Sequence, residues 1–159
     1  MRKIGIIAVL SLMALALAAV PALAQNGLHF VGTPTITATK TANSAFLTST
    51  GEVAGAGPTA TATLSGNANV TTGCINRGSK DQQPSGLQTT SQSVLGSQTI
   101  HTRSGRGTFN VSTNPVGTAG RTCPDQMVPV LVGVTFTDVT LTVTSQTGTI
   151  TYNFGTVDP

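Results

Sequence analysis

The amino-acid sequence predicts an all-β protein: an antiparallel, immunoglobulin-like β-sandwich with about seven or eight strands and one disulfide bond. Two observations carry this prediction. Two classes of residue alternate without a break over 59–74, and Val, Leu and Phe alternate with other residues over 128–143. A period of two places alternate side chains on opposite faces of a strand, whereas a helix would scatter them around its axis. No segment combines a helical period with capping residues.

The first alternating segment, 59–74, has an inward set of small residues. Its outward set consists of Thr, Ser, Asn and Gly, which suit a face in contact with water. Small inward side chains need an opposing surface that approaches closely or supplies larger side chains. We expect the valine-rich C-terminal segment to supply them. The inward set is Ala60, Ala62, Leu64, Gly66, Ala68, Val70, Thr72 and Cys74.

The valine-rich segment changes phase near its middle. Its valines and Phe136 occupy even positions before Thr137, with Leu131 among the residues between them. After Asp138 its apolar residues occupy odd positions. Because a change of phase sends every later side chain to the other face, we expect a bulge or corner at Thr137–Asp138. Residues 145–148 then predict a turn into a last strand with Ile150, Tyr152 and Phe154 on one face. The even set is Val128, Val130, Val132, Val134 and Phe136, and the odd set is Val139, Leu141 and Val143.

The other strands have weaker signals. Pro34 lacks an N–H group, which suits an edge strand or the beginning of a strand. Gly- and Pro-rich stretches predict loops at 77–86 and 114–126. The expected strands are residues 30–41, 45–53, 87–101 (as one strand or two) and 108–113.

Residues 1–24 predict a cleaved signal peptide. Arg2 and Lys3 precede an apolar run, and Ala22-Leu23-Ala24 forms a small-residue cleavage motif. Residues 25–159 then form a single domain with no apolar run long enough to span a membrane. We therefore expect a secreted, extracellular protein.

Cleavage of the signal removes most of the positive charge. The whole chain carries a formal net charge of +3, whereas residues 25–159 contain six Lys or Arg and five Asp or Glu, a net charge of +1. A net charge this small gives no electrostatic basis for binding nucleic acid or an anionic membrane. Thr, Ser and Gly make up 57 of these 135 residues, a composition that permits disorder. The alternation over 59–74 favours a sheet instead.

Cys74 and Cys123 are the only cysteines, and secretion predicts that they form a disulfide. The bridge would close a loop of 49 positions. In the chain-entropy description a loop of this length adds about 4 kcal/mol of stability. A Cys-x-x-Cys redox motif is absent, and His29 and His101 are too scattered in the sequence to complete a zinc site.

Three motifs occur in order along the chain: Asn26-Gly27-Leu28-His29-Phe30, Cys74-Ile75-Asn76-Arg77-Gly78 and Cys123-Pro124-Asp125-Gln126. Together they resemble a group of small secreted bacterial and fungal proteins with an N-x-x-F start, a C-x-N-x-G motif and a C-P-x-x-Q-like motif. Here the first motif is one residue longer and the third one residue shorter, and Asp125 stands where the group often has Gly. The resemblance implies secretion, an all-β domain and one disulfide, and it implies no catalytic activity.

Catalytic residues are sparse, and we expect the protein not to be an enzyme. His29 and His101 are the only imidazole bases, and neither lies beside a nucleophile motif. We expect no cofactor and no metal, because the acidic residues form neither a calcium-binding cluster nor a close pair for glycoside hydrolysis. These residues are Glu52, Asp81, Asp125, Asp138 and Asp158.

The composition favours a structural or cell-surface and matrix protein. Outward Thr rows support strands, and few charges mean little electrostatic protection against pairing between strand edges. The N-terminal segment 25–41, with Pro34 as its only guard, is a candidate strand for addition to a neighbouring copy, as in a filament. The expected partners are further copies of the chain or components of a surface or matrix.

The alternative is a monomeric binding module for a polysaccharide or a protein, using the loops near the disulfide. Sugar sites usually present aromatic rings, and residues 25–159 contain no Trp. A third possibility, an inhibitor of a secreted enzyme, would depend on loop 77–86. The candidate contact residues for the binding module are Arg77, Lys80, Arg103, Arg106, Arg121 and Tyr152.

Overall fold

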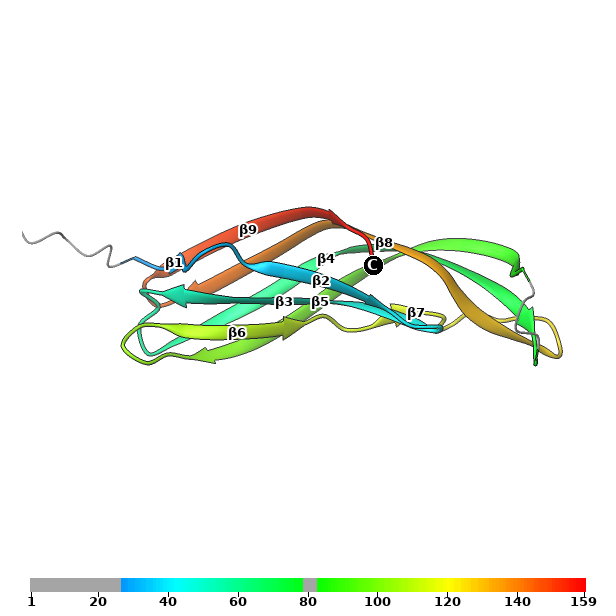
Figure 1. Ribbon diagram of the computed structural model, residues 1–159, viewed down its shortest axis with the longest axis horizontal. Coiled ribbons are helices and arrows are strands. Elements are labelled where there is room, and N and C mark those ends of the chain that lie inside the picture. The colour runs from blue at the N-terminus through cyan, green and yellow to red at the C-terminus, as the bar shows by residue number, and fades with distance from the viewer. Residues whose placement is uncertain (1–26, 79–82) are drawn as a thin grey trace, which may run out of the picture.

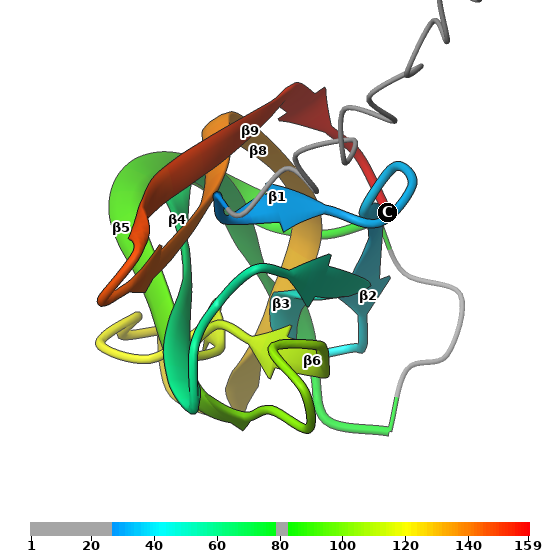
Figure 2. The same ribbon diagram turned by 90° about the vertical axis from the view of Figure 1, so that its left-hand side faces the viewer.

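The computed structural model describes residues 27–78 and 83–159. This part of the chain is all-β, with two antiparallel sheets arranged as a sandwich, nine strands and no helix. The predicted fold class is confirmed, and Figures 1 and 2 show the sandwich to be elongated. Two of the nine strands have only two residues each, which accounts for the smaller number expected from the sequence. The predicted signal peptide, Lys80 and Asp81 lie outside the described residues.

Sheet A is built on both edges of β3 (Ser44–Ala54). One edge pairs with β1 (His29–Phe30) and then with β2 (Thr35–Lys40), which follow one another along it. The other edge pairs with β6 (Gly107–Ser112) and β7 (Val116–Gly117) in the same manner. The expected first strand is therefore interrupted before Thr35. This position fits Pro34, which has no N–H group to donate to the ladder.

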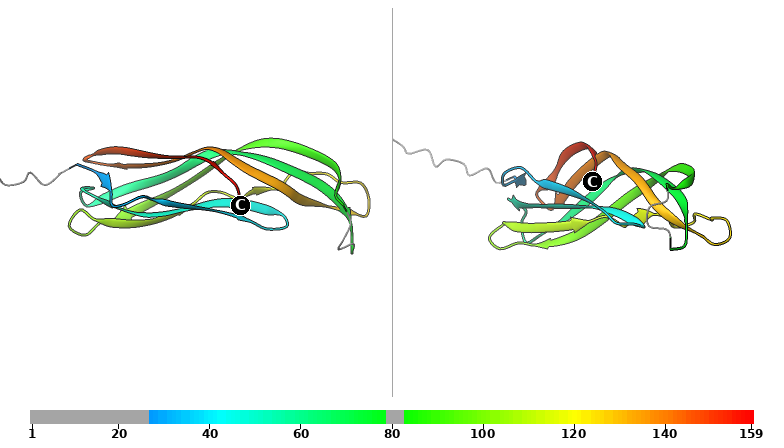
Figure 3. Two further views of the ribbon diagram at one scale, coloured as in Figure 1. Left: turned by 45° about the horizontal axis from the view of Figure 1, so that its top comes forward. Right: turned by 45° about the vertical axis from the view of Figure 1, so that its right-hand side comes forward.

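Sheet B has the order β5-β4-β8-β9. Its strands are β5 (Ser85–His101), β4 (Thr59–Asn76), β8 (Met127–Ser145) and β9 (Gly148–Val157). The segment expected to form one or two strands is the single strand β5. Figures 1 and 3 show that β4, β5 and β8 run on beyond the ends of β2 and β3. At that end of the molecule the described residues place no sheet opposite sheet B.

The core confirms the alternation in β4 and corrects its expected neighbour. The small inward residues Ala60, Ala62 and Ala68 are buried. However, the valine-rich strand β8 lies beside β4 in the same sheet rather than across from it. The layer opposite is sheet A, whose buried Leu47 and Phe109 supply large side chains to the same core. Alternation identifies the face of a residue, but it does not identify the strand that lies opposite.

The predicted bulge in β8 is confirmed at Asp138. The pairing of β8 with β4 and with β9 changes register between Phe136 and Thr140, and Asp138 has a φ of 54°. Phe136 and Val139 are both fully buried on either side of this point. The extra residue therefore lets apolar residues of both parities face the same core.

A second irregularity in β8 was not predicted. The register with β4 shifts at Val132, which is 36% exposed, whereas Leu131 is buried. The expectation that Val132 shares an inward face with Val134 and Phe136 is therefore wrong. At this bulge the Leu131 amide donates to the Ala42 carbonyl at 2.8 Å. This hydrogen bond links β8 of sheet B to the β2–β3 turn of sheet A.

Candidate functional site

The disulfide joins Cys74, near the end of β4, to Cys123, in the segment between β7 and β8. The two Cα atoms are 5.8 Å apart, within the usual range for a disulfide. The predicted pairing is confirmed. It fastens the segment 118–126 beside the part of sheet B that extends beyond sheet A.

A polar groove lies on this extended part of sheet B. On the inner face of β5, buried Val94 and Ile100 give way to Gln88, Thr90 and Gln92 toward the disulfide end. Sheet A does not cover this part of β5, so polar side chains in contact with water are the stable choice. We call this feature the disulfide-end groove. Its volume is about 290 Å³, and it is lined by Thr72, Gln88, Thr90, Gln92, Gly117, Ala119, Gly120 and Arg121.

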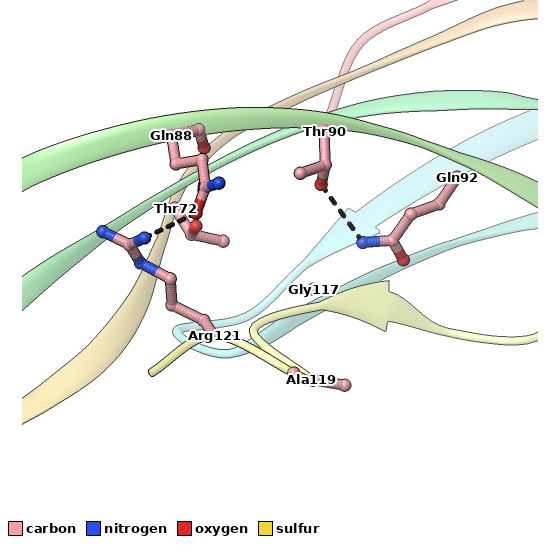
Figure 4. A pocket seen from close by; sticks show the side chains of 8 residues that line it. Thr72, Gln88, Thr90, Gln92, Gly117, Ala119 and Arg121 are labelled. Carbon is pink, nitrogen blue, oxygen red and sulfur yellow. Dashed lines mark hydrogen bonds between the residues drawn. The ribbon is translucent and has the colours of Figure 1, made fainter. Parts of the chain in front are cut away.

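Arg121 forms one wall of the disulfide-end groove (Figure 4). Its Nη1 atom donates to Oε1 of Gln88 at 2.5 Å, and its Nη2 atom donates to the carbonyl oxygen of Gly86. Its Nε atom is buried and has no hydrogen-bond partner among the described residues. Arg121 therefore holds its loop against β5, and much of its donor capacity is already used.

A second cavity of about 430 Å³ lies at the same end of the molecule. It is lined by Asn76, Arg77 and Gln126, and the Arg77 amide donates to the Gln126 carbonyl at 3.1 Å. The backbone on either side of the disulfide is thus linked by this hydrogen bond as well.

The candidate cations are divided between the two ends of the sandwich. Arg77 and Arg121 lie at the disulfide end, whereas Arg103 and Arg106 lie in the β5–β6 turn at the opposite end. Nε of Arg106 forms an ion pair with Oε1 of Glu52 at 2.8 Å. The four described arginines of the suggested basic rim are therefore divided into two pairs at opposite ends, and they do not form one rim.

Tyr152 belongs to an apolar strip along one side of the sandwich. Its ring packs against Phe30 and Phe154, and in Figure 2 β1 lies between β9 and β2. In the part of the chain that the structure describes, the half-buried apolar side chains that pack onto the core come from these three strands. We call the strip the lateral seam, and its members are Phe30, Ile36, Ala38, Ile150, Tyr152, Phe154 and Val157.

The two histidines lie apart from any cluster of chemical groups. Nδ1 of His29 is 2.8 Å from the Gly27 carbonyl oxygen, and His101 is exposed at the end of β5. Within 27–78 and 83–159, no group of three or more His, Cys, Asp or Glu side chains is arranged to hold a metal ion. The same residues contain no helix long and apolar enough to cross a membrane. The absence of enzymatic activity stays a prediction.

Comparisons of the chain with protein-family models, curated proteins and solved structures found no match. The resemblance that the three sequence motifs suggest therefore stays a prediction. What the structure adds is the disulfide-end groove and the lateral seam. The alternation of Gln88, Thr90 and Gln92 is the sequence signal that would have indicated the groove.

Proposed function

We propose that the protein is a secreted, non-enzymatic structural protein of an extracellular surface or matrix, whose copies associate through strand edges. The observation that carries this proposal is the lateral seam. It places apolar side chains that are only half buried beside the outer edges of β2 and β9. A strand with an unpaired edge is a template for another strand, and further pairing would cover these side chains.

The outer face of sheet B supports the same proposal. Its central rows consist of hydroxyl side chains, which stabilise strands and add no charge repulsion between copies. The disulfide suits an oxidising environment such as the extracellular space. Two neighbouring rows across β5, β4, β8 and β9 are Thr99, Thr61, Thr144 and Thr149, and Ser97, Thr63, Thr142 and Thr151.

The N-terminal segment is one candidate for the joining element. In the structure β1 and β2 pair with β3 of their own chain. In a strand-exchanged assembly, the same segment of a neighbouring copy would occupy this edge of β3. Deletion of residues 25–33 would then abolish oligomers, and an unchanged mass would exclude this form of exchange.

The proposed function is tested by the mass of the native secreted protein. Light scattering coupled to size-exclusion chromatography, over a wide range of protein concentration, should show species larger than one copy. Electron microscopy of the largest species distinguishes closed oligomers from filaments. The mass of one copy at every concentration would contradict the proposal.

A second candidate function, a binding module, is favoured by the disulfide-end groove. Its hydroxyl and amide groups are suited to hydrogen bonding with a polysaccharide. Affinity electrophoresis in gels containing polysaccharides should then show retardation of the protein. Arg121→Ala should remove the retardation and Arg103→Ala, at the other end of the molecule, should preserve it. Equal mobility of the protein in all gels would exclude this candidate for the polysaccharides used.

A further inference from the structure

Besides β9, the described sheets have three outer edges: that of β5, that of β6 and β7, and that of β1 and β2. The edges of β5 and β6 are joined by hydrogen bonds. Leu95 of β5 donates its amide to Oδ1 of Asn114 at 2.7 Å and accepts from the Asn114 amide at 2.9 Å. The Asn110 amide of β6 donates to Oε1 of Gln98 at 2.7 Å. Polar groups along β5 and β6 are therefore already satisfied where the two sheets meet at this corner.

The third edge, formed by β1 and β2, carries a second feature that discourages pairing besides Pro34, the only one expected from the sequence. Pro34 precedes β2 and offers no N–H group, and Lys40 ends the strand with a positive charge. Nζ of Lys40 donates to the Val132 carbonyl of β8 at 2.8 Å. Prolines and lysines are common guards of exposed edges.

The outer edge of β9 has neither kind of guard. Residues 148–157 contain no charged residue and no proline, and among the described residues β9 pairs only with β8. Its inward side chains Ile150, Tyr152 and Phe154 are half buried. Within the described part of the chain, local protection of this edge is found at Gly155, whose amide donates to Oδ1 of Asn153 at 2.7 Å. The open part of the edge is therefore residues 149–154.

We propose that β9 pairs antiparallel with β9 of a second copy across a two-fold axis, joining the two four-stranded B sheets into one continuous sheet. This inference rests on the proposed function and names the surface that mediates it. Directly opposite residues must point to the same face of a sheet. The register centred on Thr151 satisfies this condition and places Ile150 of each copy opposite the partner's Tyr152.

A second copy suits this edge better than a charged partner does. Two uncharged segments meet without like-charge repulsion, whereas a charged strand would find no opposite charge within β9. An isologous pair also covers the half-buried inward side chains of both copies at once. Because so short a segment buries less area than a standard interface, association should depend on protein concentration.

The test uses opposite charges at one exposed position of the full secreted chain. Thr151→Lys and Thr151→Glu each place like charges together at the two-fold axis, so each variant alone should self-associate about tenfold or more weakly. An equimolar mixture of the two should recover association. Thr61→Lys is the matched control, since it changes an exposed Thr on the outer face of β4, an inner strand of the same sheet. Sedimentation velocity gives the dissociation constants.

Each result supports or overturns the β9 interface, the proposed function or both. If the unaltered protein associates and Thr151→Lys associates equally well, the β9 interface is wrong and the proposed function stands. If deletion of residues 25–33 alone abolishes association, the N-terminal segment is the joining element. A single-copy mass at every concentration overturns both proposals. Circular dichroism confirms that each variant is folded, and Thr149→Lys provides a second charge on the same edge.

Discussion

The ring of Phe30 lies edge-on to the ring of Tyr152, with centroids 6.2 Å apart and planes inclined by 86°. Phe30 belongs to sheet A and Tyr152 to sheet B, so this contact joins the two sheets at the lateral seam. Phe30 also makes an edge contact with Phe109, at 6.5 Å between centroids. A short strand at the beginning of the described chain thus contributes to closing one side of the core.

Replacing Phe30 tests the energetic role of this contact. We expect Phe30→Ala to lower the free energy of unfolding by about 1–2 kcal/mol, less than for a fully buried phenylalanine because the side chain is only half buried. Denaturant unfolding provides the measurement. Leu87→Ala is the control, because Leu87 is 61% exposed and its loss should have almost no effect. Equal effects of the two substitutions would contradict a closing role for Phe30.

The disulfide should be a major source of stability. Replacing Cys74 and Cys123 together by Ala should lower the free energy of unfolding by about 4 kcal/mol, because the unfolded chain regains the freedom of a long loop. Reduction of the unaltered protein should have a similar effect. A loss below about 1 kcal/mol in both experiments would show that the segment is held mainly by other contacts.

The bulge at Asp138 requires a residue that tolerates a positive φ. Asp138→Asn should leave stability nearly unchanged, because Asn adopts this conformation readily. Asp138→Val should lower the free energy of unfolding by about 1–2 kcal/mol, because a β-branched side chain is strained there. Thr142→Val, in the regular part of the same strand, is the control. Thermal unfolding of the three variants should show Asp138→Val to be the least stable. An Asp138→Val protein as stable as the unaltered chain would contradict the prediction.

The close approach of β5 to the end of β6 should make Gly96 intolerant of a side chain. A Cβ atom at Gly96 would lie 2.0 Å from the carbonyl oxygen of Ser112. We expect Gly96→Ala to cost about 1–3 kcal/mol by forcing these backbones apart. Gly133→Ala is the control, since nothing lies within 4 Å of its added atom. If denaturant unfolding gives the same stability for both variants, the two strands do not pack as described.

The sequence predicted individual strands well because each strand carries its own alternation. The buried face of β4, the bulge at Asp138 and the turn before β9 all follow from local parity. The bulge at Val132 does not, because Val130, Val132 and Val134 keep a regular period through it. At this bulge the Leu131 amide donates to Ala42 of the β2–β3 turn, a distant segment that a local pattern does not identify.

The candidate functional site also has features that the sequence predicted and features that it did not. The pairing of Cys74 with Cys123 was predictable because no other cysteine exists. The sequence did not predict that two arginines, Arg77 and Arg121, lie far from Arg103 and Arg106. All four are in loops or turns, and the sequence does not show at which end of the sandwich each loop lies. The length of β5, which carries its two ends far apart, sets that separation.

The sequence by itself determined an all-β fold with one disulfide, because side-chain period and cysteine count are properties of the chain alone. Only the tertiary structure decided that β8 lies beside β4, that sheet B extends beyond sheet A, and that β9 keeps an uncharged open edge. The physical reason is that strand edges, grooves and opposing layers depend on which segments, far apart in the sequence, lie next to each other in space. Local alternation fixes which way a side chain points, and the packing of the two sheets fixes what it meets.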